Sequence, residues 1–167
     1  MKTTMLSHLQ RGAAMLLLAG LTACATYGPG DLQPGLSETE VTQRLGAPTG
    51  RYALPEGRTR LEFARGPFGR HTFMVDVDAS GRMVSWGQVL EPRFFSLIVP
   101  GQSRDEVLRT IGRPGEVAGM MRNGQIWSWR YPNNDCLWYQ VSLDAAGTVT
   151  RAGYGVERGC DAPNDRS

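Results

Sequence analysis

Few side chains in this sequence have the type and spacing that catalysis or metal binding requires. His71 is the only histidine beyond residue 8, and one histidine cannot make a multi-histidine metal site or, without suitable neighbours, a Ser-His-Asp arrangement. Asp76 and Asp78 could share one face of a strand as paired carboxylates, but Asp78 opens an Asp-Ala-Ser-Gly segment, which is typical of a turn. We therefore expect no catalytic residue, no metal ligand and no cofactor, and we predict that the chain is not an enzyme.

The first cysteine, Cys24, ends a segment with the features of an export signal. Lys2 and Arg11 make its beginning positive, and the apolar residues 13–19 are too few to cross a bilayer as a helix. The letters LTAC at 21–24 match the lipobox that lipoprotein-processing enzymes recognise. This resemblance implies cleavage before Cys24 and lipidation of its sulfur.

The residue after Cys24 bears on where such a lipoprotein would reside. It is Ala25, whereas an aspartate at this position typically retains lipoproteins in the inner membrane. We therefore predict that the lipid anchors the chain to the outer membrane, on the periplasmic face. The inner membrane is the less favoured alternative.

The two remaining cysteines, Cys136 and Cys160, form an isolated pair. In an oxidising compartment such a pair predicts a disulfide bond. Two free thiols are the alternative interpretation.

The aromatic residues of the second half are the best candidates for contact with other molecules. Trp127 and Trp129 are two residues apart in a strand-like run, so they share one face, and we expect them to lie in the core. Trp138 alternates with Tyr139 and would point to the other face. We therefore predict that Trp138 is exposed and contacts a partner protein.

Charge gives no support for binding to nucleic acid. The formal net charge is +2, and Lys2 and Arg11 account for it. No basic block stands out in the rest of the chain, so we expect no nucleic-acid partner.

The chain repeats itself at an offset of 66 residues. Pro34-Gly35 falls on Pro100-Gly101, and the identities continue without a gap as far as Glu91 and Glu157. Such ordered matches in one register indicate two copies of one module. We place them at residues 31–96 and 97–162, preceded by a signal peptide (1–23) and a lipidated tether (24–30), and followed by a short tail (163–167).

Each copy begins with a helix signature. Ser37 and Ser103 open S-x-x-E capping boxes, and the helices should end at Gly46 and Gly112, where a proline two residues later prevents continuation. Strand-like runs follow, two of them joined by an Asp-Ala-x-Gly hairpin loop. The predicted strands are residues 59–64, 72–78 and 82–90, and then 125–131, 137–144 and 148–156.

These elements predict an α+β fold made of two tandem modules. Each module would be a short helix, or a helix pair, packed on a three-stranded antiparallel meander. A single module of this size buries little of its surface, so we expect the two modules to pack together.

The shared residues resemble the SmpA/OmlA (BamE-like) family of outer-membrane lipoproteins. The likeness rests on Pro-Gly-x-Ser-x-x-Glu-Val, on Leu/Ile-Gly-x-Pro and on the Asp-Ala-x-Gly hairpin, each present once in each copy, and on the aromatic strand at 127–131 of the second copy. The tandem arrangement is also similar to beta-lactamase inhibitor proteins. The sequence departs from the BamE pattern in having two modules and only a short segment after the lipidated cysteine, so a role in barrel assembly stays open.

This family resemblance implies a non-catalytic outer-membrane lipoprotein that acts through protein–protein contacts in envelope assembly or integrity. The membrane and an unidentified envelope protein would be its partners. The alternative function is a periplasmic, inhibitor-like binding module that acts on an envelope enzyme.

Overall fold

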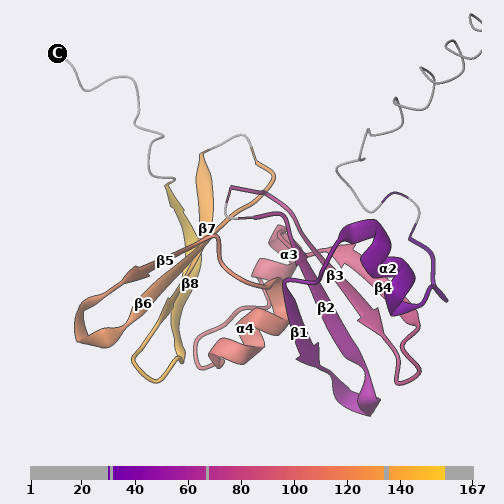
Figure 1. Cartoon of the computed structure of the whole chain (residues 1–167). Coiled ribbons are helices and arrows are strands. Elements are labelled where there is room, and N and C mark those ends of the chain that lie inside the picture. Colours follow the sequence, from indigo (N-terminus) through magenta and orange to yellow (C-terminus); the bar gives the residue numbers. More distant parts are fainter. Residues whose placement is uncertain (1–29, 31, 67, 134–135, 157–167) are drawn as a thin grey trace, which may run out of the picture. The chain divides into compact units, whose positions relative to one another are not determined.

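The computed structural model describes residues 30, 32–66, 68–133 and 136–156 (Figure 1). Cys24, Cys160, the predicted signal peptide and the C-terminal tail lie outside the described residues. The fold below belongs to the compact unit Asp31–Ser167.

The described residues form two four-stranded antiparallel sheets, with strand orders β1-β2-β3-β4 and β5-β6-β7-β8 (Figure 1). We call them sheet 1 and sheet 2. The elements of the first half are α2 (Glu38–Leu45), β1 (Gly50–Ala53), the 3-10 turn η1 (Pro55–Gly57), β2 (Thr59–Ala64), β3 (Thr72–Val77) and β4 (Met83–Gln88). After the short helix α3 (Pro92–Phe95) come α4 (Arg104–Ile111), β5 (Glu116–Gly119), the 3-10 turn η2 (Met121–Asn123), β6 (Gln125–Arg130), β7 (Leu137–Leu143) and β8 (Val149–Val156).

The predicted fold class, a helix on a three-stranded meander in each module, is wrong. Each sheet has a fourth strand at its edge, β1 in sheet 1 and β5 in sheet 2. The helices are short, and most of the regular secondary structure is in the two sheets. These edge strands are four residues long and contain a glycine, and alternate residues are exposed, so they show no apolar run. In the turns after them Glu56 and Arg122 adopt positive φ (62° and 59°), which favours glycine, although Gly57 and Asn123 beside them also have positive φ.

The 66-residue offset read from the sequence also relates the elements of the structure. Helix α2 begins at Glu38 and α4 at Arg104, and the strands β1, β2 and β4 start 66 residues before β5, β6 and β8. Isolated bridges join Ser37 to Arg82 and Ser103 to Thr148 at the same offset. The two halves therefore follow one plan down to single hydrogen bonds.

Both predicted capping boxes are confirmed. The Ser37 hydroxyl accepts the Glu40 backbone N–H at 3.3 Å, and the Glu40 carboxylate accepts the Ser37 backbone N–H at 2.8 Å. Ser103 and Glu106 repeat this arrangement at the start of α4. Each helix ends, as predicted, at a glycine with positive φ.

Each helix packs its apolar residues against one face of its own sheet. In the first half, Val41 and Leu45 of α2 join Leu61, Phe63 and Val75 in one buried cluster. In the second half, α4 and sheet 2 form a core with apolar residues of the connecting segment: Leu90, Phe95, Ile98, Val107, Ile111, Trp127, Trp129, Tyr139 and Val141. The prediction that Trp127 and Trp129 lie in the core is thus confirmed.

Candidate protein-binding surface

The second face of sheet 1, turned away from α2, is polar and yet buried. By alternation with the core residues it carries Arg60 and Glu62 of β2 and Thr72, Met74 and Asp76 of β3. Glu62 has no exposed surface, and Thr72, Met74 and Asp76 are at most 8% exposed. We call this set the sheet-1 outer face. Buried polar groups need hydrogen-bond partners, and these come in part from the second half of the chain.

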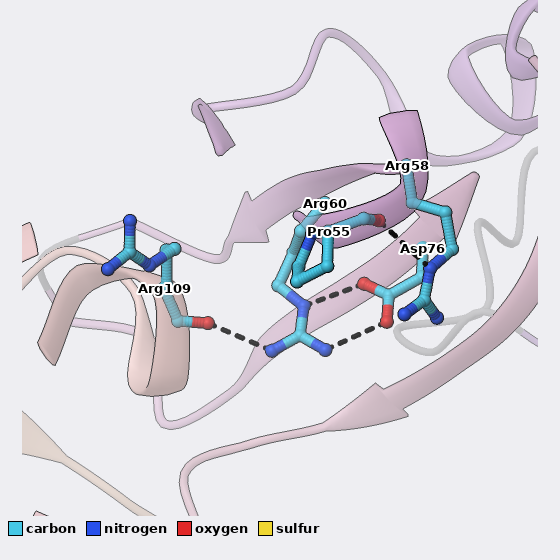
Figure 2. A network of polar contacts seen from close by, with 5 residues as sticks. All are labelled: Pro55, Arg58, Arg60, Asp76 and Arg109. Carbon is cyan, nitrogen blue, oxygen red and sulfur yellow. Dashed lines mark hydrogen bonds and ion pairs between the residues drawn. The ribbon is translucent and has the colours of Figure 1, made fainter. Parts of the chain in front are cut away.

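Arg60 links the two halves through its guanidinium. Its Nε donates to Asp76 Oδ1 at 2.6 Å and its Nη2 to Asp76 Oδ2 at 2.8 Å, while Nη1 donates to the backbone carbonyl of Arg109 at 2.9 Å (Figure 2). That carbonyl lies in the last turn of α4, where a cation is favourable. The hydrogen bonds to Asp76 raise the pKa of Arg60 above its ordinary value. The charged fork therefore holds the end of α4 against the sheet-1 outer face.

Glu62 makes the second link. Its carboxylate accepts hydrogen bonds from the Tyr52 hydroxyl, from Thr49 Oγ1 at 3.1 Å and from the Arg113 backbone N–H at 3.1 Å. Gly112 allows this close approach, because a Cβ there would lie 3.0 Å from Glu62 Cδ. The buried carboxylate thus has its full set of hydrogen bonds only when the turn after α4 is in place.

Neither aspartate of the sequence pair acts as a free carboxylate. Asp76 is paired with Arg60. Asp78 accepts the backbone N–H groups of Ser80 at 2.9 Å and Arg82 at 3.0 Å, which is the turn role predicted for it. These hydrogen bonds lower the pKa of Asp78, with the Ser80 side chain as the largest cause.

His71 also has a structural environment. It precedes β3 and is half-buried, and its ring stacks on Phe73 with centroids 6.1 Å apart. Burial lowers the pKa of His71, and the nearby charge of Arg65 adds to the effect. Among the described residues no three His, Cys, Asp or Glu side chains gather as a metal site.

The corresponding face of sheet 2 has a different composition. The 66-residue offset places Ile126, Ser128, Trp138, Gln140 and Ser142 where sheet 1 has Arg60, Glu62, Thr72, Met74 and Asp76. Ile126, Gln140 and Ser142 are half-buried, and Arg151, paired with Ser142 across the β7–β8 ladder, is exposed.

Ile126, Gln140, Ser142 and Arg151 form what we call the sheet-2 surface. They line a hollow of about 310 Å³, together with Gly153, Tyr154 and Gly155. An amide, a hydroxyl and a guanidinium can bind polar groups of a partner, but they include no nucleophile paired with a base. These side chains are therefore suited to hydrogen bonding with another molecule.

The prediction that Trp138 is exposed is wrong. Trp138 is 3% exposed, and the Arg130 guanidinium, on the neighbouring strand, lies 4.2 Å from its ring centroid. Its indole N–H has no acceptor within the described part of the chain. Alternation predicted the correct face for Trp138, but not that the side chain opposite would cover it.

The residues that line the hollow were missed in the sequence because they are ordinary polar residues. Gln140 and Ser142 alternate with Tyr139, Val141 and Leu143, so their shared face could be read from the sequence. The hollow on this face could not be predicted from the sequence, because it depends on which parts of the face the rest of the chain covers.

Of the three cysteines, only Cys136 falls within the described residues. It is exposed and is disulfide-bonded. Because Cys24 and Cys160 lie outside the described residues, the pairing of Cys136 with Cys160 stays a prediction. No helix in the described part of the chain is long and apolar enough to cross a membrane.

The Glu62 cluster predicts an effect of Tyr52→Phe on stability. Removing the hydroxyl that donates to a fully buried carboxylate should lower the free energy of unfolding by about 2 kcal/mol, measured by urea denaturation. Tyr154→Phe is the matched control, since Tyr154 is 51% exposed, and it should change stability little. Equal effects of the two substitutions would contradict the role of Tyr52.

The same cluster gives the wild type a pH dependence. Burial, and then the Glu62 carboxylate, raise the pKa of Tyr52 above its ordinary value of 10.0. The folded state then binds this proton more tightly than the unfolded state does, so this contribution to stability is present below pH 10 and is lost above it. Tyr52→Phe should lose less stability than the wild type above pH 10.

Comparisons with known proteins do not identify a family. The chain matches no protein-family model, and no curated protein matches it significantly. A cysteine-rich secretory protein from Staphylococcus aureus subsp. aureus Mu50 is similar in structure, with 14% sequence identity and a TM-score of 0.29. The match covers 73% of this chain and 42% of that protein, so the chain spans less than half of its length. At this TM-score the likeness carries no argument about fold or function.

Proposed function

We propose that this chain is an outer-membrane lipoprotein, anchored through Cys24 and facing the periplasm, that contacts other envelope proteins and catalyses no reaction. The anchor rests on the charged start, the short apolar run and the LTAC lipobox at residues 21–24. The resemblance of the capping-box and Gly-x-Pro motifs to the SmpA/OmlA family supports the same class of envelope protein.

One observation carries the proposal that the chain acts by contact. The sheet-1 outer face binds a protein segment inside the chain, since Arg60 and Glu62 hold the backbone at Arg109 and Arg113. The equivalent sheet-2 surface has a hollow lined by polar side chains. The second half thus presents, at the position where the first half binds backbone, a polar hollow with different side chains that an external partner can contact.

The environments of the candidate catalytic residues support a non-catalytic role. Asp76 is neutralised by Arg60, Asp78 builds a turn, and His71 stacks on Phe73. Each of the titratable residues singled out in the sequence thus has a structural task in the fold.

The anchor predicts the behaviour of Cys24→Ser. The serine cannot carry the thioether, so the precursor should stay uncleaved and unlabelled in cells fed a palmitate analogue. Measurement of the label and of the mass of the purified chain checks this. Incorporation equal to that of the wild type would show that the anchor is elsewhere or absent.

The contact surface predicts a result in affinity capture. After mild crosslinking of intact cells, the full chain should recover the same envelope protein in repeated experiments. That protein can also be a second copy of this chain. The double variant Ser142→Glu with Arg151→Glu should lose that protein, since it reverses the charge of the sheet-2 surface. Met121→Glu adds a negative charge at a residue that is 91% exposed in η2, and it should bind as the wild type does. Failure of the wild type to recover any envelope protein reproducibly would overturn the proposal.

The hollow favours one second candidate function, inhibition of a periplasmic enzyme. A hollow of about 310 Å³ lined by donors and acceptors can receive a loop of an enzyme. The processed protein, extracted in mild detergent, should then inhibit a beta-lactamase or a murein hydrolase in titrations, and Arg151→Glu should weaken that inhibition. No inhibition of either enzyme class would remove this candidate.

A further inference from the structure

The C-terminal end of α2 is the open counterpart of the docked end of α4. The offset places Gln43, Gly46 and Ala47 where α4 and its turn have Arg109, Gly112 and Arg113. Gly112 is buried, and a Cβ there would meet Glu62, Thr72 and Met74 at 3.0–3.1 Å. Gly46 is exposed, and a Cβ there would meet no described atom within 4 Å.

The sheet-2 surface is likewise the open counterpart of the sheet-1 outer face. In the first half, that face binds the end of α4 through Arg60 and Glu62. In the second half, Ile126, Gln140 and Ser142 hold the positions of Arg60, Met74 and Asp76, and they line a hollow. The chain thus carries a counterpart of each member of its own internal interface, and each counterpart has exposed or half-buried residues in the described part of the chain.

We propose that the sheet-2 surface of one copy binds the C-terminal end of α2, residues 43–48, of a second copy. This inference rests on the proposed function, a protein that acts by contact, and it names the partner. Within one chain, the end of a helix packs on the outer face of a sheet. The proposed contact would repeat this packing between two chains.

The side chains of the sheet-2 surface suit such an occupant. The last turn of α2 presents backbone carbonyl groups with partial negative charge. Arg65 Nη1 donates to the carbonyl of Leu45 at 3.4 Å, and the exposed Arg151 of a second copy is a further cation that these groups can attract. The Ser142 hydroxyl and the Gln140 amide can donate to the same carbonyls or accept the Ala47 N–H. Ile126 holds the position at which Arg60 meets Arg109, so it offers an apolar contact to the aliphatic part of Gln43.

The differences between the two faces set the position and strength of this contact. Trp138 stands where sheet 1 has Thr72, and Ser128, where sheet 1 has Glu62, is only 3% exposed. The space in which Gly112 rests on sheet 1 is therefore filled on sheet 2, and the helix end sits beside it, over Gln140 and Ser142. Without counterparts of the Arg60 fork and the Glu62 carboxylate, association is weaker than the packing within the chain. A common membrane anchor would raise the effective concentration of the copies.

Because the two surfaces differ, the contact joins copies head to tail. When two copies bind in this way, the copy that contributes its sheet-2 surface still has a free α2 end. The copy that contributes its α2 end still has a free sheet-2 surface. Such heterologous contacts give rows of copies unless a rotation closes them into a ring.

Photocrosslinking of the full chain in its own membranes tests the proposal. Two versions with different affinity tags are expressed together, one of them with p-benzoylphenylalanine in place of Ser142. Irradiation should give an adduct that carries both tags, and mass spectrometry should map the joined peptide to residues 43–48. Arg151→Glu should reduce the adduct about tenfold or more, because it places a negative charge against the helix carbonyls. Met121→Glu, outside the surface, should leave the yield unchanged.

The outcomes separate this inference from the proposed function. An adduct between the two tagged copies at residues 43–48 supports both. An adduct with a different envelope protein alone overturns the self-association and leaves the proposed function standing. Two tagged copies joined elsewhere in the sequence overturn the inference about α2, and no adduct at position 142 overturns this surface as a contact site altogether.

Discussion

A carboxylate with no exposed surface is costly to bury, and Glu62 is such a group at the centre of this fold. Its three partners come from β1, from the turn before it and from the turn after α4, so they span both halves of the chain. Arg60 and Asp76 lie next to it on the same face, and their ion pair is completed by a carbonyl of α4. The first half of the chain therefore reaches its full set of hydrogen bonds only when the second half is folded against it.

This polar link has no equivalent on the outer face of the second half. The equivalent positions of the second half hold Ile126 and Ser128, and Trp138 covers the region with the help of Arg130. The last repeat of an array commonly differs from the inner ones on its outer face, because no further repeat packs there. The two copies thus share one backbone plan. They differ in the few side chains on the outer face of the sheet that need hydrogen-bond partners from another module.

Much of the plan could be predicted from the sequence because local chemistry decides it. The Ser-x-x-Glu boxes, the glycines after the helices and the Asp-Ala-x-Gly hairpins act within a few residues, and β2, β3, β6, β7 and β8 follow the alternation of apolar residues closely. The edge strands β1 and β5 were missed because hydrogen bonds to the neighbouring strand, and not apolar burial, define them.

The candidate site could be predicted far less well. The burial of Trp138 depends on Arg130 across the ladder, and the hollow beside it depends on what the chain leaves uncovered. Similarly, the burial of Glu62 could not be predicted from the sequence, because a glutamate between Leu61 and Phe63 is typical of the solvent-exposed face of a strand. Its burial comes from residues about 50 positions later in the chain.

The polar character of the sheet-1 outer face has a consequence for the way the chain is made. A chain that enters its compartment N-terminus first can form sheet 1 before the residues that will cover it arrive. An apolar outer face would be adhesive during that interval, whereas Arg60, Glu62 and Asp76 can be hydrated until α4 arrives. A seam made of charges and hydrogen bonds thus exposes less apolar surface before α4 packs on sheet 1 than an apolar seam would, and so favours aggregation less.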